Sequence, residues 1–298
     1  MTTPASVADR LVLGTVQFGL AYGVSHQGGP VARSEAAAIL ACASEHGIRT
    51  LDTAAAYGES ESVLGELFDA NASLGIVTKT VPIRTDRLEA SDIAVIDEGF
   101  HRSLVRLRRD RVSALLVHDS RDLLASGGDR LWALLETYRT NGLAARIGVS
   151  AYDATEIEAV LARYPVELMQ LPASVFDQRL VIDGTLARLA SRGVAVHIRS
   201  LFLQGLLLMA PAELPVSLAS AVPAVQRWRE VCAAEAVTPL AAALAFGMAQ
   251  SVEGLVIGVH SRTHLMECLA AIEQPVVLPW ASFACNEAAV VDPRRWRQ

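Results

Sequence analysis

The feature that most constrains this chain is a helical stretch that ends at a glycine and leads at once into an apolar strand pattern. It occurs at Gly47 in EHGIRTLD, at Gly142 in TNGLAARIGVS and at Gly193 in SRGVAVHIRS. Glycine is well suited to the left-handed residue that follows a helix. Because parallel strands need a crossover of a dozen or more residues, which a helix usually supplies, this repeated alternation predicts a parallel sheet.

Eight short aliphatic or β-branched runs occur along the chain, and the stretches between them have helical periodicity, as in SEAAAILACASEHG. Eight strands is the number that closes a barrel, and 298 residues is a normal length for such a domain. We therefore expect an α/β fold, a (β/α)8 TIM barrel formed by residues 1–298 as a single domain; an open doubly wound sheet is the alternative. The expected strands are 11–13, 49–52, 75–79, 113–118, 145–149, 167–170, 194–199 and 254–257.

The longest interval between expected strands runs over about residues 201–253, with a proline-containing loop followed by two helical stretches. In a barrel this interval is an insertion after strand seven. A tail of about 278–298 follows the last helical stretch.

Composition excludes several classes of protein. The formal net charge is −6, which argues against a nucleic-acid partner. No uncharged apolar run reaches the roughly 18 residues of a membrane span, so no membrane association is expected. The N-terminus does not resemble a signal peptide, and the 4 cysteines form no CxxC pair, which together predict a cytoplasmic protein with reduced thiols. No metal-ligand spacing is present, so no metal site is expected.

Titratable residues end three consecutive expected strands: Asp52, Lys79 and His118, with Tyr57 five residues after the aspartate. Each alone is more often a cap or a rim residue, but the carboxyl ends of barrel strands converge on one site. A tyrosine beside a lysine is a plausible proton donor, because a nearby ammonium favours the phenolate.

Eight segments occur in this order along about residues 11–273: LGTVQFGLAYGV, GIRTLDTAAAYGESESVLGE, IVTKT, LLVHD, RIGVSAYD, LMQLP, RSLFLQGLLL and LVIGVHSRTHLMECL. These segments and their order resemble those of the aldo-keto reductase family, in particular a bacterial subgroup. The resemblance implies a (β/α)8 barrel that interconverts a carbonyl group and an alcohol by hydride transfer from a nicotinamide cofactor.

The resemblance also implies catalytic roles. Tyr57 would be the general acid/base, Lys79 would lower its pKa, and Asp52 would hold Lys79. His118 would orient the substrate carbonyl. The substrate would be a small aldehyde, ketone or sugar.

The implied cofactor is NADPH or NADP, with NADH possible. Four positions depart from the commoner family residues. Arg199 replaces an aromatic that stacks on nicotinamide, Ala151 an asparagine, and Cys268 an asparagine that reads adenine. His264 replaces an arginine or glutamine near the adenosine 2′-phosphate. The cofactor-binding residues implied are Thr15, Gln17, Asp52, Ser150, Gln170, Arg199, Ser200, Gln204, Gly205, Gly258, Ser261, His264 and Glu267.

Two other functions remain open at this point. One is a barrel that binds NADP(H) with little turnover and acts as a redox-sensing or partner-binding module. The other is an aldolase or isomerase that uses Lys79 as a Schiff base. The presence of all four catalytic-type residues favours the reductase.

Overall fold

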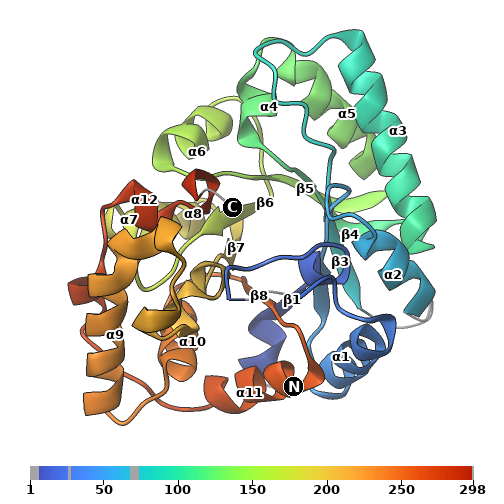
Figure 1. Cartoon of the computed structure of the whole chain (residues 1–298). Coiled ribbons are helices and arrows are strands. Elements are labelled where there is room, and N and C mark those ends of the chain that lie inside the picture. The colour runs from blue at the N-terminus through green and yellow to red at the C-terminus, as the bar shows by residue number, and fades with distance from the viewer. Residues whose placement is uncertain (1–6, 26–27, 68–73, 297–298) are drawn as a thin grey trace, which may run out of the picture.

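Eight parallel strands close into a barrel in their order along the chain, and β1 pairs with β8 to complete the ring. The computed structural model describes residues 7–25, 28–67 and 74–296. Figure 1 shows the strands at the centre with the helices around them. The strands are β1 (Leu11–Gly14), β2 (Thr50–Asp52), β3 (Gly75–Lys79), β4 (Val112–Val117), β5 (Ala144–Ser150), β6 (Leu168–Pro172), β7 (Ala195–Arg199) and β8 (Gly254–Gly258).

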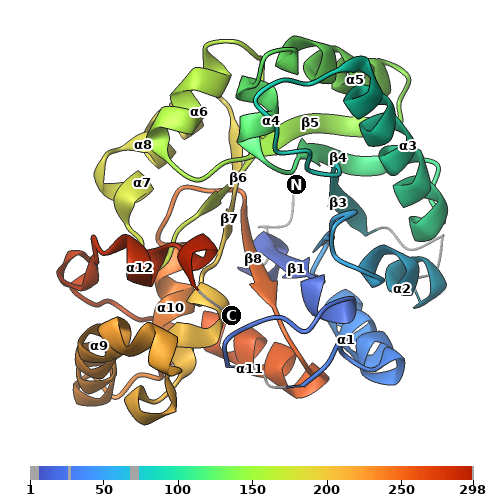
Figure 2. The same cartoon turned by 45° about the horizontal axis from the view of Figure 1, so that its top comes forward.

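Helices follow the strands and cover the outside of the barrel, as the second view also shows (Figure 2). The three glycine joints have the expected geometry, since Gly47, Gly142 and Gly193 all have φ between 72° and 83°. The (β/α)8 barrel is thereby confirmed. The helices are α1 (Arg33–Glu45), α2 (Ser60–Leu67), α3 (Ala90–Leu107), α4 (Ser120–Leu124), α5 (Gly128–Thr140), α6 (Ala154–Leu161), α7 (Arg179–Ile182), α8 (Thr185–Ser191), α9 (Val222–Ala234), α10 (Pro239–Met248), α11 (Arg262–Ile272) and α12 (Ala288–Val291).

The interior of the barrel is filled by a small aliphatic cluster of Val77, Ala114, Leu116 and Leu168, separate from the larger core between strands and helices. Side chains two positions apart on a strand point to the same face. The residues two positions after Val77, Leu116 and Leu168 therefore face the same interior, one layer nearer the carboxyl ends. This layer is where the polar residues of the expected site lie.

Every strand except β3 differs from the sequence-based expectation by one or two residues at one or both ends, and two of these differences concern residues of the expected site. β6 continues to Pro172, because this buried residue still pairs with Arg199 of β7. Gln170 therefore lies within the strand and does not end it. β4 ends at Val117, so His118 is the first residue beyond the strand.

The chain between β7 and β8 forms three short 3₁₀ segments, Leu203–Leu208, Pro211–Glu213 and Val216–Ala221, followed by α9 and α10. After α11, the described part of the tail contains the 3₁₀ turn Trp280–Phe283, α12 and the 3₁₀ turn Pro293–Arg295. Residues 1–6 and 297–298 of the expected domain lie outside the described residues.

Among the described residues, no single helix is both long and apolar enough to cross a membrane. The same residues contain no group of three or more His, Cys, Asp or Glu side chains placed to hold a metal ion.

Candidate active site

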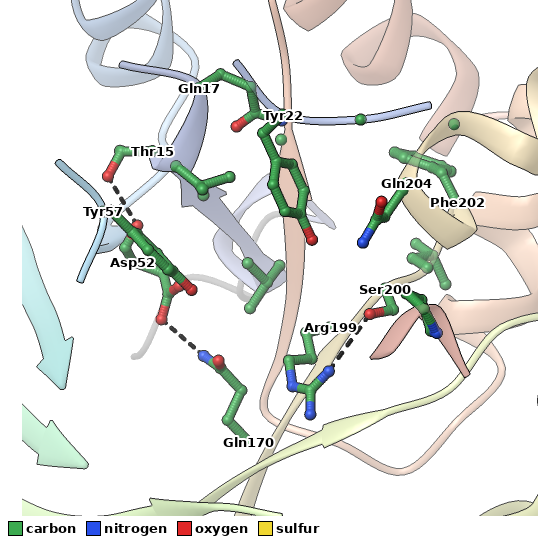
Figure 3. Close-up of a pocket in the computed structure, with 18 of the residues that line it drawn as sticks. Thr15, Gln17, Tyr22, Asp52, Tyr57, Gln170, Arg199, Ser200, Phe202 and Gln204 are labelled. Carbon is green, nitrogen blue, oxygen red and sulfur yellow. Dashed lines mark hydrogen bonds between the residues drawn. The ribbon is translucent and has the colours of Figure 1, made fainter. Parts of the chain in front are cut away.

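A cavity of about 980 Å³ opens at the carboxyl ends of the barrel strands. Every site residue expected from the sequence lines it except Ser261. Figure 3 shows several of these side chains converging from the loops after β1, β2 and β7 and from β6. The members that line it are Thr15, Gln17, Asp52, Tyr57, Lys79, His118, Ser150, Gln170, Arg199, Ser200, Gln204, Gly205, Gly258, His264 and Glu267.

Lys79 and Asp52 form a buried ion pair at the base of the cavity, with side chains only 1% and 4% exposed. The Lys79 Nζ donates to Asp52 Oδ1 at 2.8 Å, to Asp52 Oδ2 at 2.9 Å and to the Thr53 carbonyl at 2.9 Å. Gln170 Nε2 donates to the second Asp52 oxygen at 2.6 Å. Burial lowers the pKa of Lys79, but its Nζ donates to three acceptors, so it is poorly placed to form a Schiff base.

Tyr57 lies above this ion pair and beside His118. The Lys79 Nζ is 5.0 Å from the centre of the Tyr57 ring, and the Tyr57 and His118 rings meet edge to face with centroids 5.8 Å apart. Burial, and then the Asp52 carboxylate, raise the pKa of Tyr57 above its ordinary value. The lowering of the Tyr57 pKa expected from Lys79 is therefore outweighed, first by burial of the phenol and then by the Asp52 carboxylate. Tyr57 is a neutral phenol at physiological pH.

His118 is also uncharged. Burial lowers its pKa to about 3, and the cations Lys79 and Arg199 act in the same direction. Its Nδ1 is buried and has no hydrogen-bond partner within the described residues. The mouth of the barrel thus presents two neutral groups, a phenol and an imidazole, each able to share a proton with a ligand oxygen.

The ends of β1 and β8 form a second, narrower part of the cavity. Gln17 is buried, and its Oε1 is an acceptor without a partner in the described structure. Its amide lies directly against Gly258, where a Cβ atom would come within 2.2 Å of Gln17 Nε2. A ligand hydroxyl or amide could satisfy this acceptor, so the feature fits a polar cofactor. Thr15 is different, because its hydroxyl already donates to the Asp52 carbonyl at 2.9 Å.

The loop after β7 has an unusual backbone. Ser200, Leu203 and Gln204 have φ values of 61°, 46° and 54°, a region that side chains other than glycine adopt rarely. Val24 in the loop after β1 donates its N–H to the Gln204 carbonyl at 2.9 Å, which links the two loops. Backbone strain of this kind clusters at ligand sites.

The far end of the cavity lies against α11. The Ser261 side chain caps this helix by accepting from the His264 N–H at 3.1 Å, which explains why it does not line the cavity. His264, Glu267 and Cys268 line it from the first turns of the helix.

Sequence reasoning missed a group of cavity residues on the loops and the tail. Tyr22 and Tyr152 follow β1 and β5, and burial raises the pKa of Tyr22 to about 12. The position of Tyr152, two residues after the expected Ser150, was a usable signal. The other missed charged residues are Arg84, Asp119, Arg121, Asp292, Arg294 and Arg295.

Comparison with solved structures supports the fold. The aldo-keto reductase AKR11C1 from Bacillus halodurans (holo form) aligns with a TM-score of 0.75 and 20% identity, over 96% of this chain and 95% of that one. The PA4992 protein of Pseudomonas aeruginosa, described as an aldo-keto reductase, aligns with a TM-score of 0.65 and 23% identity, over 88% and 89% of the two chains.

Sequence comparison points to the same group. A curated aldo-keto reductase of Mycolicibacterium smegmatis is 32% identical over 146 residues, which cover 45% of this chain and 46% of that protein, so the match spans about half of each. The model of the aldo/keto reductase family matches residues 10–282. On this match, which spans nearly the whole barrel, the chain belongs to the aldo/keto reductase family.

Proposed function

We propose that this protein reduces the carbonyl group of a small aldehyde, ketone or sugar to an alcohol, with NADPH as hydride donor and Tyr57 as proton donor. The observation that supports this most is the convergence of Tyr57, His118 and the Lys79–Asp52 pair in one cavity. Its volume of about 980 Å³ is at the upper end for ligand sites, as a dinucleotide with a small substrate requires. A cytoplasmic location is part of the proposal.

When bound, the nicotinamide cofactor would supply the hydride. The Tyr57 hydroxyl would donate its proton to the carbonyl oxygen as that oxygen gains charge. The raised pKa of Tyr57 keeps the phenol protonated, which suits reduction. Neutral His118 would share a hydrogen bond with the same oxygen and so fix the orientation of the carbonyl.

The Lys79–Asp52 pair would act on Tyr57 from below. The ammonium lies 5.0 Å from the ring centre and favours the charge that develops on the phenol oxygen during proton transfer. Gln170 and Thr53 fix the pair in position.

The cofactor would lie along the strand ends from β5 to β8. Ser150 and Gln170 would hold the nicotinamide amide, and Arg199 its ring. The unpaired Gln17 acceptor beside Gly258 supports binding of a polar ligand there. The adenosine end would lie against α11. The residues proposed for the pyrophosphate are Ser200, Gln204 and Gly205. The residues proposed for the adenosine are His264 and Glu267, together with Ser261, which would act indirectly by capping α11.

The test is a fluorescence titration with NADPH and NADH, followed by NADPH oxidation with panels of aldehydes, ketones and aldoses. We expect tighter binding of NADPH than of NADH, and turnover with at least one carbonyl class. The variant His264→Ala should reduce the preference for NADPH. Tight binding without turnover across the panels would instead favour the redox-sensing or partner-binding module.

A further inference from the structure

The cavity is cationic although the chain is acidic. Its lining contains six Lys or Arg side chains and four Asp or Glu side chains, whereas the whole chain has 26 and 32. The arginines of the lining come from β7, from the segments that follow β3 and β4, and from the tail. The cations of the lining are Lys79, Arg84, Arg121, Arg199, Arg294 and Arg295.

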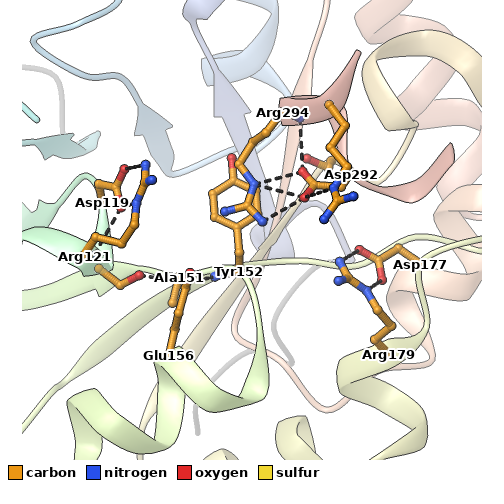
Figure 4. A network of polar contacts seen from close by, with 12 residues as sticks. Asp119, Arg121, Ala151, Tyr152, Glu156, Asp177, Arg179, Asp292 and Arg294 are labelled. Carbon is orange, nitrogen blue, oxygen red and sulfur yellow. Dashed lines mark hydrogen bonds and ion pairs between the residues drawn. The ribbon is translucent and has the colours of Figure 1, made fainter. Parts of the chain in front are cut away.

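Five of these six cations contact a carboxylate, with Arg84 and Arg121 sharing Asp119 and with Arg294 and Arg295 sharing Asp292. Arg294 contacts both Asp292 oxygens at 2.8–3.2 Å, and Arg121 contacts both Asp119 oxygens at 2.9 and 2.6 Å (Figure 4). Such bidentate pairs use the guanidinium fork fully. These two arginines are therefore neutralised locally, as Lys79 is by Asp52.

Arg199 is the exception. Its side-chain hydrogen bonds in the described structure are long ones to neutral oxygens, 3.5 Å to Ser200 Oγ and 3.4 Å to the Ala151 carbonyl. Its guanidinium carbon is 4.0 Å from the centre of the Tyr152 ring, and that of Arg294 is 3.6 Å from the same centre. Tyr152 thus fixes two guanidinium groups inside the cavity, one of which has no carboxylate partner among the described residues.

The charge of Arg199 acts on the reacting groups. It opposes the rise in the pKa of Tyr57 and contributes to the low pKa of His118. With a nicotinamide cofactor bound nearby, the uncompensated charge of Arg199 would disfavour the positive charge that accompanies loss of hydride. An anion bound beside Arg199 would remove the penalty.

We propose that the natural substrate is an anionic carbonyl compound whose oxyanion, a carboxylate or a phosphate, is bound by Arg199 with Arg294 beside it. This inference rests on the proposed function. A guanidinium has five donors in a planar fork that matches both oxyanions, and the long contacts of Arg199 leave it free to take a better acceptor. The carbonyl end of the same molecule would then reach Tyr57 and His118.

The first arm of the test uses matched substrate pairs. The carboxylate pair is 4-oxobutanoate and butanal, and the phosphate pair is glyceraldehyde 3-phosphate and glyceraldehyde. The readout is the ratio of kcat/KM within each pair, in which effects on cofactor binding cancel. We expect the anionic member of one pair to be preferred, and Arg199→Gln to reduce that ratio by about 10- to 100-fold, the loss of a charged hydrogen-bond pair.

Arg179→Gln is the matched control. Arg179 forms a bidentate pair with Asp177 at 2.7 and 2.9 Å, much as Arg294 does with Asp292, but it does not line the cavity. The kcat/KM ratio of Arg179→Gln within each substrate pair should equal that of the wild type. Added salt should lower the wild-type ratio, because it screens the attraction.

The second arm needs no turnover. The melting temperature of the cofactor-free protein is measured with succinate, with inorganic phosphate and with neutral succinamide at constant ionic strength. Stabilisation by one anion in the wild type, absent in Arg199→Gln, supports the oxyanion site even if no carbonyl compound is turned over, in which case the proposed function fails alone. The inference is overturned if wild type and Arg199→Gln have equal kcat/KM ratios and no anion stabilises the wild type specifically. It is also overturned if Arg199→Gln keeps the preference for the anionic substrate.

Discussion

His118 should make the folded protein sensitive to mild acid. Burial, followed by the charges of Lys79 and Arg199, lowers its pKa to about 3, whereas an imidazole in an unfolded chain has a pKa of about 6.5. Between these two values the unfolded chain binds a proton at this position and the folded chain does not. The free energy of unfolding therefore falls as the pH decreases through this interval. At pH values above the interval the imidazole is neutral in both the folded and the unfolded chain, so it does not affect stability in this way.

The size of the effect follows from the two pKa values. Each unit of difference is worth about 1.4 kcal/mol, so at about pH 4.5, two units below the unfolded pKa, the loss approaches about 2.7 kcal/mol. At this pH the folded group is still neutral, so the result depends little on its exact folded pKa. Because His118 lines an open cavity and solvent reaches part of the ring, we expect about 1.5–2.5 kcal/mol.

The assay is urea unfolding of the cofactor-free protein at about pH 7 and about pH 4.5. The variant His118→Gln cannot take up a proton, so it should lose less stability than the wild type between the two pH values, by the amount given above. His101→Gln is the control, because the His101 side chain is 57% exposed on α3 and lies outside the cavity. If wild type and His118→Gln lose equal stability, the imidazole is solvated and the argument for a neutral His118 is wrong.

Three further changes test the site. Tyr57→Phe should lower kcat by about 100- to 10,000-fold with little change in the Kd of the cofactor, measured by fluorescence, and near-normal turnover would exclude Tyr57 as proton donor. Lys79→Met leaves Asp52 buried without its partner, so it should lower the free energy of unfolding by about 3–5 kcal/mol and also abolish turnover; normal turnover would refute its role. Gly258→Ala places a Cβ 2.2 Å from the amide of Gln17, and we expect about ten-fold weaker cofactor binding with an unchanged melting temperature. An unchanged Kd of the cofactor in Gly258→Ala would show that Gln17 does not bind the cofactor.

The sequence predicts the barrel and its polar layer well, because both depend on local and periodic signals. Glycines at the ends of α1, α5 and α8 determine where each following strand begins. Once the strands are parallel and in order, alternation along each strand brings Lys79, Gln170 and Arg199 to the same interior. The contact of Gln170 with Asp52 was not foreseen, because the sequence does not show that β6 extends past Gln170 to Pro172.

The direction of the Tyr57 pKa shift was not predictable from the residues alone. A lysine near a tyrosine lowers its pKa only while the ammonium charge is uncompensated. Here both Asp52 oxygens contact Lys79, and the phenol is buried, so desolvation dominates. Residue types indicate which groups meet, whereas the sign of a pKa shift depends on distances and burial that only the folded structure provides.

The contacts of Arg199 and Arg294 with Tyr152 join segments that are far apart in the sequence. Tyr152, Arg199 and Arg294 come from the loop after β5, from β7 and from the tail, and no periodic pattern relates them. The barrel determines where the strands end, but the path of the tail back to the cavity depends on side-chain packing along its whole length. The proposed catalytic residues Asp52, Lys79 and His118 lie at the ends of adjacent strands, so the fold itself constrains their positions. Arg294 lies outside the barrel strands, and we expect substrate selectivity in this chain to depend on residues of this kind.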